Sequence, residues 1–435
     1  MSVEAADPVA ERVEKWLGGV PPGWTGARLF EIAEAWTSNV DKHAVEGQPC
    51  VRLCNYVDVY KNDSIVDSLD FMTATATREQ IKKFRIRLGD TLITKDSETA
   101  DDIGVPAFVE YEADDLICGY HLAIVRPDSR KAVPKYLYWA LGSEPIARQW
   151  GVTAAGVTRV GIRSSDLNKV TIPLPPLDEQ RAIADYLDHE TAQIDALVAK
   201  QDEFIGLLRE RRVAAITSAV EQREPDSSFR RHVINIRQGW SPNAEPFPAD
   251  GVTEWGILKV GCSTAGVFRP EENKKLPPDV GARPDLVVRR GEIVMSRSNT
   301  RDLVGSAAVV LGEFPRLMLS DLNYGLTTAA TLDPEFAVYA LLTRRARAEL
   351  TSRAKGTSPS MQKLAQRDVL DIPLWVPGID EQRAIVECVK AQTARIDALI
   401  AKAEELIALA KERRSALITA AVTGQIDGCA ARKAS

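Results

Sequence analysis

The sequence predicts an α+β protein: two mixed α/β domains, each followed by a long helix, with the two helices forming an antiparallel coiled coil with pseudo-two-fold symmetry. Three observations lead to this fold class. A segment of 43 residues occurs twice, at 178–220 and 380–422, with 25 identical positions and no gap. Both copies have apolar residues at helical spacing. Each copy also follows a segment of similar plan, although those two segments share almost no sequence identity.

Both copies of the repeat are predicted to be uninterrupted helices. Asp178 and Asp380 are suited to N-cap positions, because a carboxylate accepts hydrogen bonds from the free N–H groups of the first turn. Neither copy contains proline, and Pro225 and Gly424 follow as helix-ending residues. An apolar stripe about 40 residues and roughly 60 Å long requires an equally long partner. We therefore expect the copies to pack on each other through Ile194, Leu197, Phe204, Leu208, Ile396, Leu399 and Leu406.

Two ordinary helices inside a larger helical domain are the alternative explanation of the repeat. That explanation requires similarity on the apolar faces only. The copies also match at charged positions, such as Glu210 and Glu412. We therefore expect the two helices to face equivalent partners as well as each other.

Composition limits the class of protein. The 435 residues are enough for two or three domains. No apolar run is long enough to span a bilayer, the N-terminus lacks the apolar core of a signal peptide, and the six cysteines are scattered. We expect a cytoplasmic protein with free thiols and no membrane association. The net charge of −6 argues weakly against nucleic acid, unless the basic residues are clustered.

The two globular segments are predicted to share one plan. The first has β-like runs at 50–54, at 82–95 around a turn at 88–90, at 105–111 and at 120–127. A helix at 134–150, a glycine-rich loop at 156–161 and an extended segment at 170–176 follow. Matching runs in the second segment lie at 257–261, 286–298, 323–350, 356–364 and 371–377. A constant helix beside a variable domain, twice, indicates one scaffold that presents two different recognition surfaces.

These patterns divide the chain into six parts. The predicted parts are an N-terminal helical extension at 1–20, a first globular domain at 21–177, a long helix at 178–222, a second globular domain at 223–379, a long helix at 380–424 and a C-terminal tail at 425–435.

Catalytic signatures are missing from the sequence. It contains neither a phosphate-binding loop nor a dinucleotide-binding glycine motif. Asp285 and Glu292 resemble the start of a nuclease carboxylate cluster, but Val294 stands where a lysine is needed. The four histidines are dispersed, and His189 is matched by Ala391 in the second copy. We expect neither metal binding nor chemistry by this chain alone.

Basic residues are concentrated in particular places. The segment 223–379 carries a net charge of about +3, whereas 21–177 carries about −3. Ordinary solvated surface is the alternative explanation for many of these residues. Together with polar loop residues, they are suited to contacts with phosphates and base edges. The predicted DNA-binding residues are Lys82, Lys83, Arg85, Arg87, Lys95, Arg159, Arg163, Arg289, Arg290, Ser296, Arg297, Asn299, Arg301, Lys355, Thr357, Ser358, Gln362 and Lys363.

Several motifs resemble those of a known family, the specificity subunits of type I restriction-modification systems. The resemblance covers nearly the whole chain and is most specific where two similar motifs precede the long helices. These motifs are WLGGVPPGW at 16–24, IPLPPLDEQRAIADYL at 172–187, IPLWVPGIDEQRAI at 372–385, IDAL at 194–197 and 396–399, and ERRSALITAAVTGQID at 412–427.

The resemblance implies a function and a set of partners. Each globular domain is then a target-recognition domain that reads one half of a split, asymmetric site in double-stranded DNA. The helices set the gap and dock two methyltransferase (modification) subunits, which restriction/translocase subunits join. Adenine-N6 methylation and ATP-dependent cleavage, with S-adenosylmethionine, Mg²⁺ and ATP, belong to those partners, and this chain binds no cofactor. The alternatives are a coiled-coil scaffold without a DNA role and the recognition subunit of another methylation-based phage-defence system.

Overall fold

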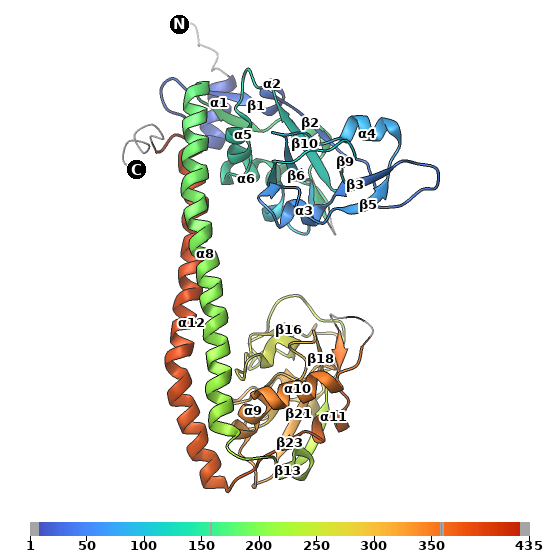
Figure 1. Ribbon diagram of the computed structural model, residues 1–435, viewed down its shortest axis with the longest axis vertical. Coiled ribbons are helices and arrows are strands. Elements are labelled where there is room, and N and C mark those ends of the chain that lie inside the picture. Colours follow the sequence, from blue (N-terminus) through green and yellow to red (C-terminus); the bar gives the residue numbers. More distant parts are fainter. Residues whose placement is uncertain (1–7, 157–158, 357, 359–360, 427–435) are drawn as a thin grey trace. The chain divides into compact units, whose positions relative to one another are not determined.

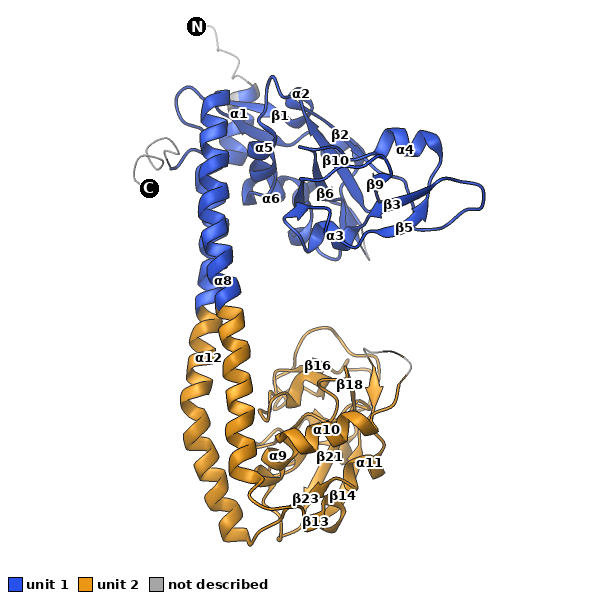
Figure 2. Cartoon of the chain, viewed as in Figure 1, with its two compact units in different colours: residues 1–200, 406–435 blue, residues 201–405 orange. Residues whose placement is uncertain are grey.

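The computed structural model describes residues 8–156, 159–356, 358 and 361–426. Its contacts divide the chain into two compact units, shown in Figure 2: unit 1 contains residues 1–200 and 406–435, and unit 2 contains residues 201–405. Both boundaries fall inside the long helices. Each unit therefore holds one globular domain together with a part of each helix.

The repeated segment forms two helices of 44 residues, α8 (Leu177–Val220) and α12 (Ile379–Val422). At 1.5 Å per residue, each helix is roughly 66 Å long. The prediction that Asp178 and Asp380 are N-caps is wrong, because each helix begins one residue earlier and both carboxylates lie in the first turn. There they still face the positive end of the helix dipole. Gly424 follows α12 with a φ of +72°, a left-handed conformation that commonly ends helices.

The two long helices pack against each other in both units. In unit 1 the first part of α8 lies beside the last part of α12, so the helices are antiparallel (Figure 2). An ion pair joins them there, between Arg414 and Asp195 at 3.0 Å. In unit 2 the equivalent residues form the same ion pair. Arg212, 202 positions before Arg414, lies 2.7 Å from Asp397, 202 positions after Asp195. The predicted fold class is confirmed.

The helices pack along a narrower line than the sequence predicts. Among the seven predicted packing residues, Ile194, Leu208 and Ile396 are buried, but the other four are 38–41% exposed. Residues three positions apart differ by about 300° around a helix, which is about 60° short of a full turn. Leu197 therefore points beside the packing line when Ile194 points into it. The four exposed residues, which the sequence placed in the packing line, are Leu197, Phe204, Leu399 and Leu406.

The globular part of unit 1 is built on two sheets (Figure 1). One has five strands in the order β2-β10-β6-β8-β4, and the other has three in the order β5-β3-β9. Two short ribbons, β1-β12 and β7-β11, complete it. The strands are β1 (Thr25–Arg28), β2 (Ala33–Thr37), β3 (Cys50–Cys54), β4 (Ser64–Ile65), β5 (Met72–Thr75), β6 (Thr91–Thr94), β7 (Asp96–Ser97), β8 (Pro106–Val109), β9 (Leu116–Cys118), β10 (Leu122–Pro127), β11 (Val160–Gly161) and β12 (Thr171–Leu174).

Helices in unit 1 pack around these sheets. Helix α1, within the predicted N-terminal extension, contacts β1, β12 and α6, and its Val13 and Leu17 are buried in the same core as the start of α8 and the end of α12. Asp7, which precedes Pro8 in the sequence and is of a residue type suited to cap this helix, lies outside the described residues. The helices are α1 (Pro8–Leu17), α2 (Leu29–Ile32), α3 (Tyr56–Tyr60), α4 (Arg78–Phe84), α5 (Pro134–Leu141), α6 (Glu144–Thr153), α7 (Ser164–Leu167) and the 3₁₀ turn η1 (Ala100–Asp102).

Unit 2 has a four-stranded sheet in the order β14-β21-β17-β19, a three-stranded sheet in the order β16-β15-β20 and the ribbons β13-β23 and β18-β22. The strands are β13 (Ser227–Ser228), β14 (Val233–Gln238), β15 (Gly256–Leu258), β16 (Asn273–Lys275), β17 (Ile293–Ser296), β18 (Ser298–Asn299), β19 (Ala307–Val309), β20 (Leu317–Met318), β21 (Asn323–Thr328), β22 (Gln362–Lys363) and β23 (Pro373–Leu374). The helices are α9 (Pro334–Leu342), α10 (Arg344–Arg353), α11 (Gln366–Leu370), η2 (Phe229–Arg231), η3 (Val260–Ser263) and η4 (Pro284–Leu286).

The two units share one topology, as the sequence predicts. In each three-stranded sheet the central strand, β3 or β15, pairs antiparallel with one neighbour and parallel with the other. The larger sheets correspond strand by strand, apart from β4, which is added at one edge in unit 1. The turn at 88–90 is also repeated, with a φ of +83° at Gly89 and +82° at Gly291.

Two predicted elements of unit 1 differ from the structure. Residues 82–87, predicted as a strand, belong to helix α4 and the segment after it. A capping box explains this, because Thr77 accepts from the backbone N–H of Gln80 and the Gln80 side chain accepts from that of Thr77. The predicted helix at 134–150 is divided into α5 and α6 at Gly142 and Ser143. The Ser143 hydroxyl donates to the Ala140 carbonyl at 2.6 Å at this break.

Candidate nucleic-acid interface

The predicted DNA-binding residues form two groups in each unit, at opposite ends of one central strand. That strand is β6 in unit 1 and β17 in unit 2. The start group lies before the strand and comprises Lys82, Lys83, Arg85 and Arg87 in unit 1 and Arg289 and Arg290 in unit 2. The end group lies beyond it and comprises Lys95, Arg159 and Arg163 in unit 1 and Ser296, Arg297, Asn299, Arg301, Lys355, Ser358, Gln362 and Lys363 in unit 2.

The start groups are largely exposed, and the one in unit 1 has an acidic neighbour. Lys82 and Lys83 are exposed in the last turn of α4. Arg85 forms an ion pair with Asp114, which neutralises part of the charge of this group in unit 1. Arg289 and Arg290 are exposed in the turn before β17.

The end group of unit 2 is assembled by the ribbon β18-β22. Asn299 lies opposite Gln362, and Ser298 lies opposite Lys363. Lys355 and Lys363 also face each other across a bridge, with backbone hydrogen bonds of 2.9 and 2.8 Å. Two like charges directly opposite each other are unfavourable in a sheet. This arrangement therefore favours binding of an anion.

Other members of the unit 2 end group have different environments. Arg301 and Ser358 are exposed, and the Gln362 side-chain amide donates to the Ser358 carbonyl at 2.8 Å. Ser296 is fully buried, so its side chain cannot reach DNA, contrary to the prediction. Arg297 is half-buried and donates to the Asp321 carbonyl at 3.2 Å. The predicted residue Thr357 lies outside the described residues.

The end group of unit 1 lies at a cavity of about 450 Å³, which one of its members lines directly. Strands β7 and β11 pair here, and Arg159, just before β11, lines the cavity. The Lys95 ammonium donates to Asp96 at 2.7 Å and lies 4.5 Å from the centre of the Tyr120 ring. Arg163 is exposed at the start of α7. Unlike its counterpart in unit 2, this end group lies beside several carboxylates that line the cavity.

A glutamine of the repeated DEQ motif holds each domain to its long helix, a role that the sequence did not reveal. The Gln180 amide donates to the carbonyls of Pro175 at 2.9 Å and Lys131 at 3.2 Å, and its oxygen accepts from the Val133 N–H at 2.7 Å. In unit 2 the Gln382 side chain repeats this pattern, and its three partners are the carbonyls of Pro377 and Thr331 and the N–H of Asp333. Both glutamines are buried. Each one ties the start of a long helix to the loop that precedes α5 or α9.

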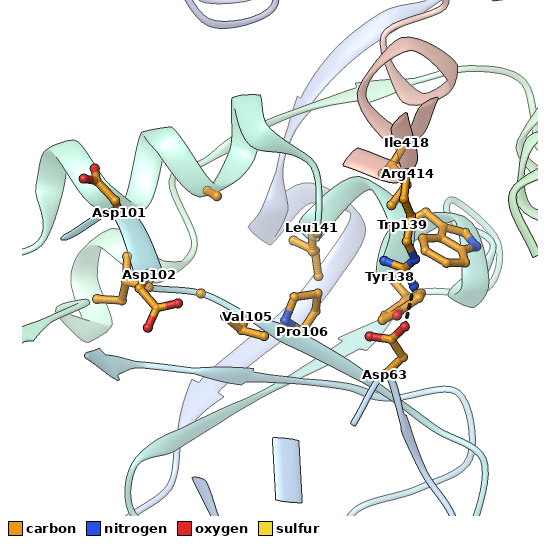
Figure 3. A pocket seen from close by; sticks show the side chains of 14 residues that line it. Asp63, Asp101, Asp102, Val105, Pro106, Tyr138, Trp139, Leu141, Arg414 and Ile418 are labelled. Atoms are coloured by element: carbon orange, nitrogen blue, oxygen red, sulfur yellow. Dashed lines mark hydrogen bonds and ion pairs between the residues drawn. The ribbon is translucent and has the colours of Figure 1, made fainter. Parts of the chain in front are cut away.

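An arginine of the repeated ERR motif makes a second tie. In unit 1, Arg414 of α12 forms ion pairs with Asp63 and Asp195 and lies 5.7 Å from the Trp139 ring. Figure 3 shows Arg414 beside Asp63, Tyr138 and Trp139 at a cavity of about 240 Å³. In unit 2 the equivalent Arg212 donates to the Ala265 carbonyl at 3.2 Å. These arginines hold each domain against the C-terminal part of a long helix.

The outer faces of the long helices carry matching apolar residues. Besides the four exposed residues described above, Leu207 and Leu409 are 58% and 55% exposed. The six form three pairs that are 202 positions apart. The repeat therefore duplicates an apolar surface that the helix packing does not use. The pairs are Leu197 with Leu399, Phe204 with Leu406, and Leu207 with Leu409.

The residues that the structure describes hold neither a membrane-spanning helix nor a cluster of metal ligands. No helix among them is long and apolar enough to cross a membrane. No group of three or more histidine, cysteine or acidic side chains in the same part of the chain is placed to hold a metal ion.

Comparison with known proteins relates the chain to one family. A family model described as the type I restriction modification DNA specificity domain matches residues 53–203. The type I restriction enzyme EcoEI specificity subunit of Escherichia coli is 27% identical over 163 residues, which are 36% of this chain and 27% of that protein. The putative type I restriction enzyme MjaX specificity subunit of Methanocaldococcus jannaschii is 28% identical over 180 residues, 39% of this chain and 40% of that protein.

These two alignments span less than half of the relatives' own length. A longer alignment, with the EcoKI specificity subunit of E. coli strain K12, is 23% identical over 63% of this chain and 61% of that protein. One solved structure comes from a report on the complex assembly and conformational transition of the type I R-M system. Its superposition on this chain has a TM-score of 0.62, and the two sequences are 18% identical. It covers 94% of this chain and 100% of that chain, and the likeness concerns the fold.

Proposed function

We propose that the chain is a specificity subunit of a type I restriction-modification system and the DNA-reading part of that complex. The domain at 21–177 reads one half of a bipartite, asymmetric site in double-stranded DNA, and the domain at 223–379 reads the other half. The helices at 178–222 and 380–424 fix the gap between the halves.

One observation carries the proposal: two units of the same topology differ in chemistry at the same end of the central strand. Unit 2 presents opposed lysines beside amide side chains, and unit 1 presents carboxylates around a cavity. Cations contact phosphates, and amides and carboxylates discriminate base edges. Two different surfaces on one scaffold support reading of two different half-sites. We assign the DNA contacts to the end groups first and to the start groups second.

The duplicated helix surface supports a partner that binds twice. Three exposed apolar pairs recur at a fixed offset on α8 and α12, and exposed apolar patches commonly mark protein interfaces. The partners are two methyltransferase subunits, to which restriction/translocase subunits add. Those partners use S-adenosylmethionine, Mg²⁺ and ATP for adenine-N6 methylation and ATP-dependent cleavage in the cytoplasm. This chain contributes DNA recognition and no catalytic group.

A gel-shift assay of the full chain together with its methyltransferase tests the proposal. A randomised DNA pool is first used to select bound sequences, and a bound duplex is then compared with versions altered in either half. We expect selection of a bipartite motif, weaker binding after a change in either half, and affinity that falls steeply with salt. Binding that is indifferent to sequence would leave the scaffold alternative as the better explanation.

A further inference from the structure

We propose that the cavity at the end of β6 in unit 1 reads one cytosine of the DNA through its exocyclic amino group, with Glu98 as the accepting side chain. This inference rests on the DNA-reading function proposed above and names a specificity-determining residue for one half-site. It is carried by the geometry of the cavity, the hydrogen bonds of its carboxylates and the contrast with unit 2.

Two of the cavity's carboxylates are already engaged. Asp96 accepts from the Lys95 ammonium at 2.7 Å and contacts the His121 Nδ1 atom at 2.8 Å. Asp102 accepts from the Tyr60 hydroxyl at 2.9 Å and from the Ser97 hydroxyl at 3.2 Å. These hydrogen bonds hold the two carboxylates in fixed positions at the wall of the cavity.

Glu98 lines the same cavity, and its side chain is exposed. Within the described part of the chain, no hydrogen bond or ion pair engages its carboxylate. An ionised carboxylate only accepts hydrogen bonds. Glu98 is therefore an available acceptor beside two acceptors that are occupied.

The charges of the residues that line the cavity determine which part of DNA can enter it. Phosphate is repelled by Asp96, Glu98 and Asp102, whereas Lys42 and Arg159 also line the cavity and are suited to neighbouring phosphates. The carboxylates accept hydrogen bonds from base edges that carry donors. In the major groove these donors are the amino groups of cytosine and adenine. Adenine also presents its N7 acceptor next to that amino group, which a carboxylate repels. Cytosine is therefore the favoured base.

Stacked tyrosines give the cavity a rigid wall. Tyr56 and Tyr60, one turn apart on α3, have ring centroids 5.3 Å apart and planes inclined by 16°. Aromatic side chains have few rotatable bonds, so such a wall loses little conformational entropy when a ligand binds. The cavity volume of about 450 Å³ is within the ordinary range for small-ligand pockets, roughly 300–1,000 Å³. A base edge approaching Glu98 thus meets a preformed surface.

Unit 2 lacks this chemistry at the equivalent positions. Thr300 replaces Glu98 and Ser298 replaces Asp96, each 202 residues later. Leu322 stands at the place of His121, because its carbonyl accepts from the Arg297 N–H as the His121 carbonyl accepts from the Lys95 N–H. Its end group instead has the opposed lysines described above. A change at Glu98 should therefore affect one half of the DNA site and leave the other half unaltered.

The test is motif selection from a randomised DNA pool by the full chain bound to its methyltransferase, using the wild type, Glu98→Gln and Glu34→Gln. Glutamine donates as well as accepts, so it matches the N6 and N7 groups of adenine. We expect Glu98→Gln to reduce cytosine preference at one position about ten-fold and to raise adenine there, without altering the other half-site. Glu34 is an exposed carboxylate of β2, near the other end of the sheet, and Glu34→Gln should select the wild-type motif.

The outcomes separate the two claims. If the wild type selects a bipartite motif and Glu98→Gln selects the same one, the cytosine-reading role of Glu98 is refuted while the DNA-reading function stands. The role of Glu98 is also refuted if the Glu98→Gln variant selects altered bases in both half-sites while its thermal unfolding matches that of the wild type. If the wild type selects no motif at all, the proposed function fails, and this inference fails with it.

Discussion

Replacing the buried glutamine at the start of a long helix should loosen the attachment of one globular domain. Gln180→Leu keeps a side chain of similar size but removes a donor to two carbonyls and the acceptor for the Val133 N–H. An unsatisfied buried polar group costs about 1–3 kcal/mol. Because one of the three bonds is buried and two are partly buried, we expect a loss of about 2–4 kcal/mol of stability.

Calorimetry of the full chain measures this loss. For a unit of this size, 1 kcal/mol shifts the midpoint of unfolding by about 2–4 °C, so Gln180→Leu should lower the unit 1 transition by about 5–15 °C. Gln382→Leu should lower the unit 2 transition instead, because its hydrogen bonds are equivalent.

The matched control is Gln193→Leu, an exposed glutamine of α8 whose side chain contacts His189. An exposed substitution of this kind changes stability by about 0.5 kcal/mol or less. If Gln180→Leu shifts the transition no more than Gln193→Leu does, the buried glutamine does not hold the domain to the helix.

Three further predictions address the helices, the basic ribbon and the domains. Ile194→Asp should disrupt helix packing and lower the midpoint of unfolding, whereas Leu399→Asp should leave unfolding unchanged and weaken methyltransferase binding in a pull-down; equal effects of both would contradict the burial pattern. Replacing Lys355 and Lys363 together by glutamine should reduce the slope of log affinity against log salt by about 2, and an unchanged slope would remove the lysines from the interface. Exchanging residues 21–177 for those of a relative should change one half-site in a methylation assay, and a change in both halves would refute independent reading.

Repetition made the architecture predictable from the sequence. A 25-of-43 identity with no gap identified both long helices, and the matching β-like runs identified two domains of one plan. Local signals near 82–87 were misjudged, because alternating apolar residues concealed a capping box that starts at Thr77. The predicted line of packing residues on the helices was also displaced from the line that the structure shows. Leu197 and Phe204 have the apolar character of buried residues, but they lie beside the line that passes through Ile194 and Ile205.

The candidate interface was predicted only in part, for a physical reason. Basic residues can be counted in a sequence, but the pairing of β18 with β22 brings Asn299 beside Gln362 across more than 60 positions. The cavity of unit 1 was missed because its key groups are acidic, and a search for phosphate contacts selects cations. Gln180 was missed because a single polar residue near a helix start resembles solvated surface until its three hydrogen-bond partners are known.

The most direct test of the central claim is a map of DNA methylation in cells that express this chain with its methyltransferase. Two different domains on one antiparallel helix pair predict one asymmetric motif in two halves, with a constant gap that disappears when this chain is deleted. A methylation map that is unchanged by the deletion, or that shows a single uninterrupted motif, would contradict the account.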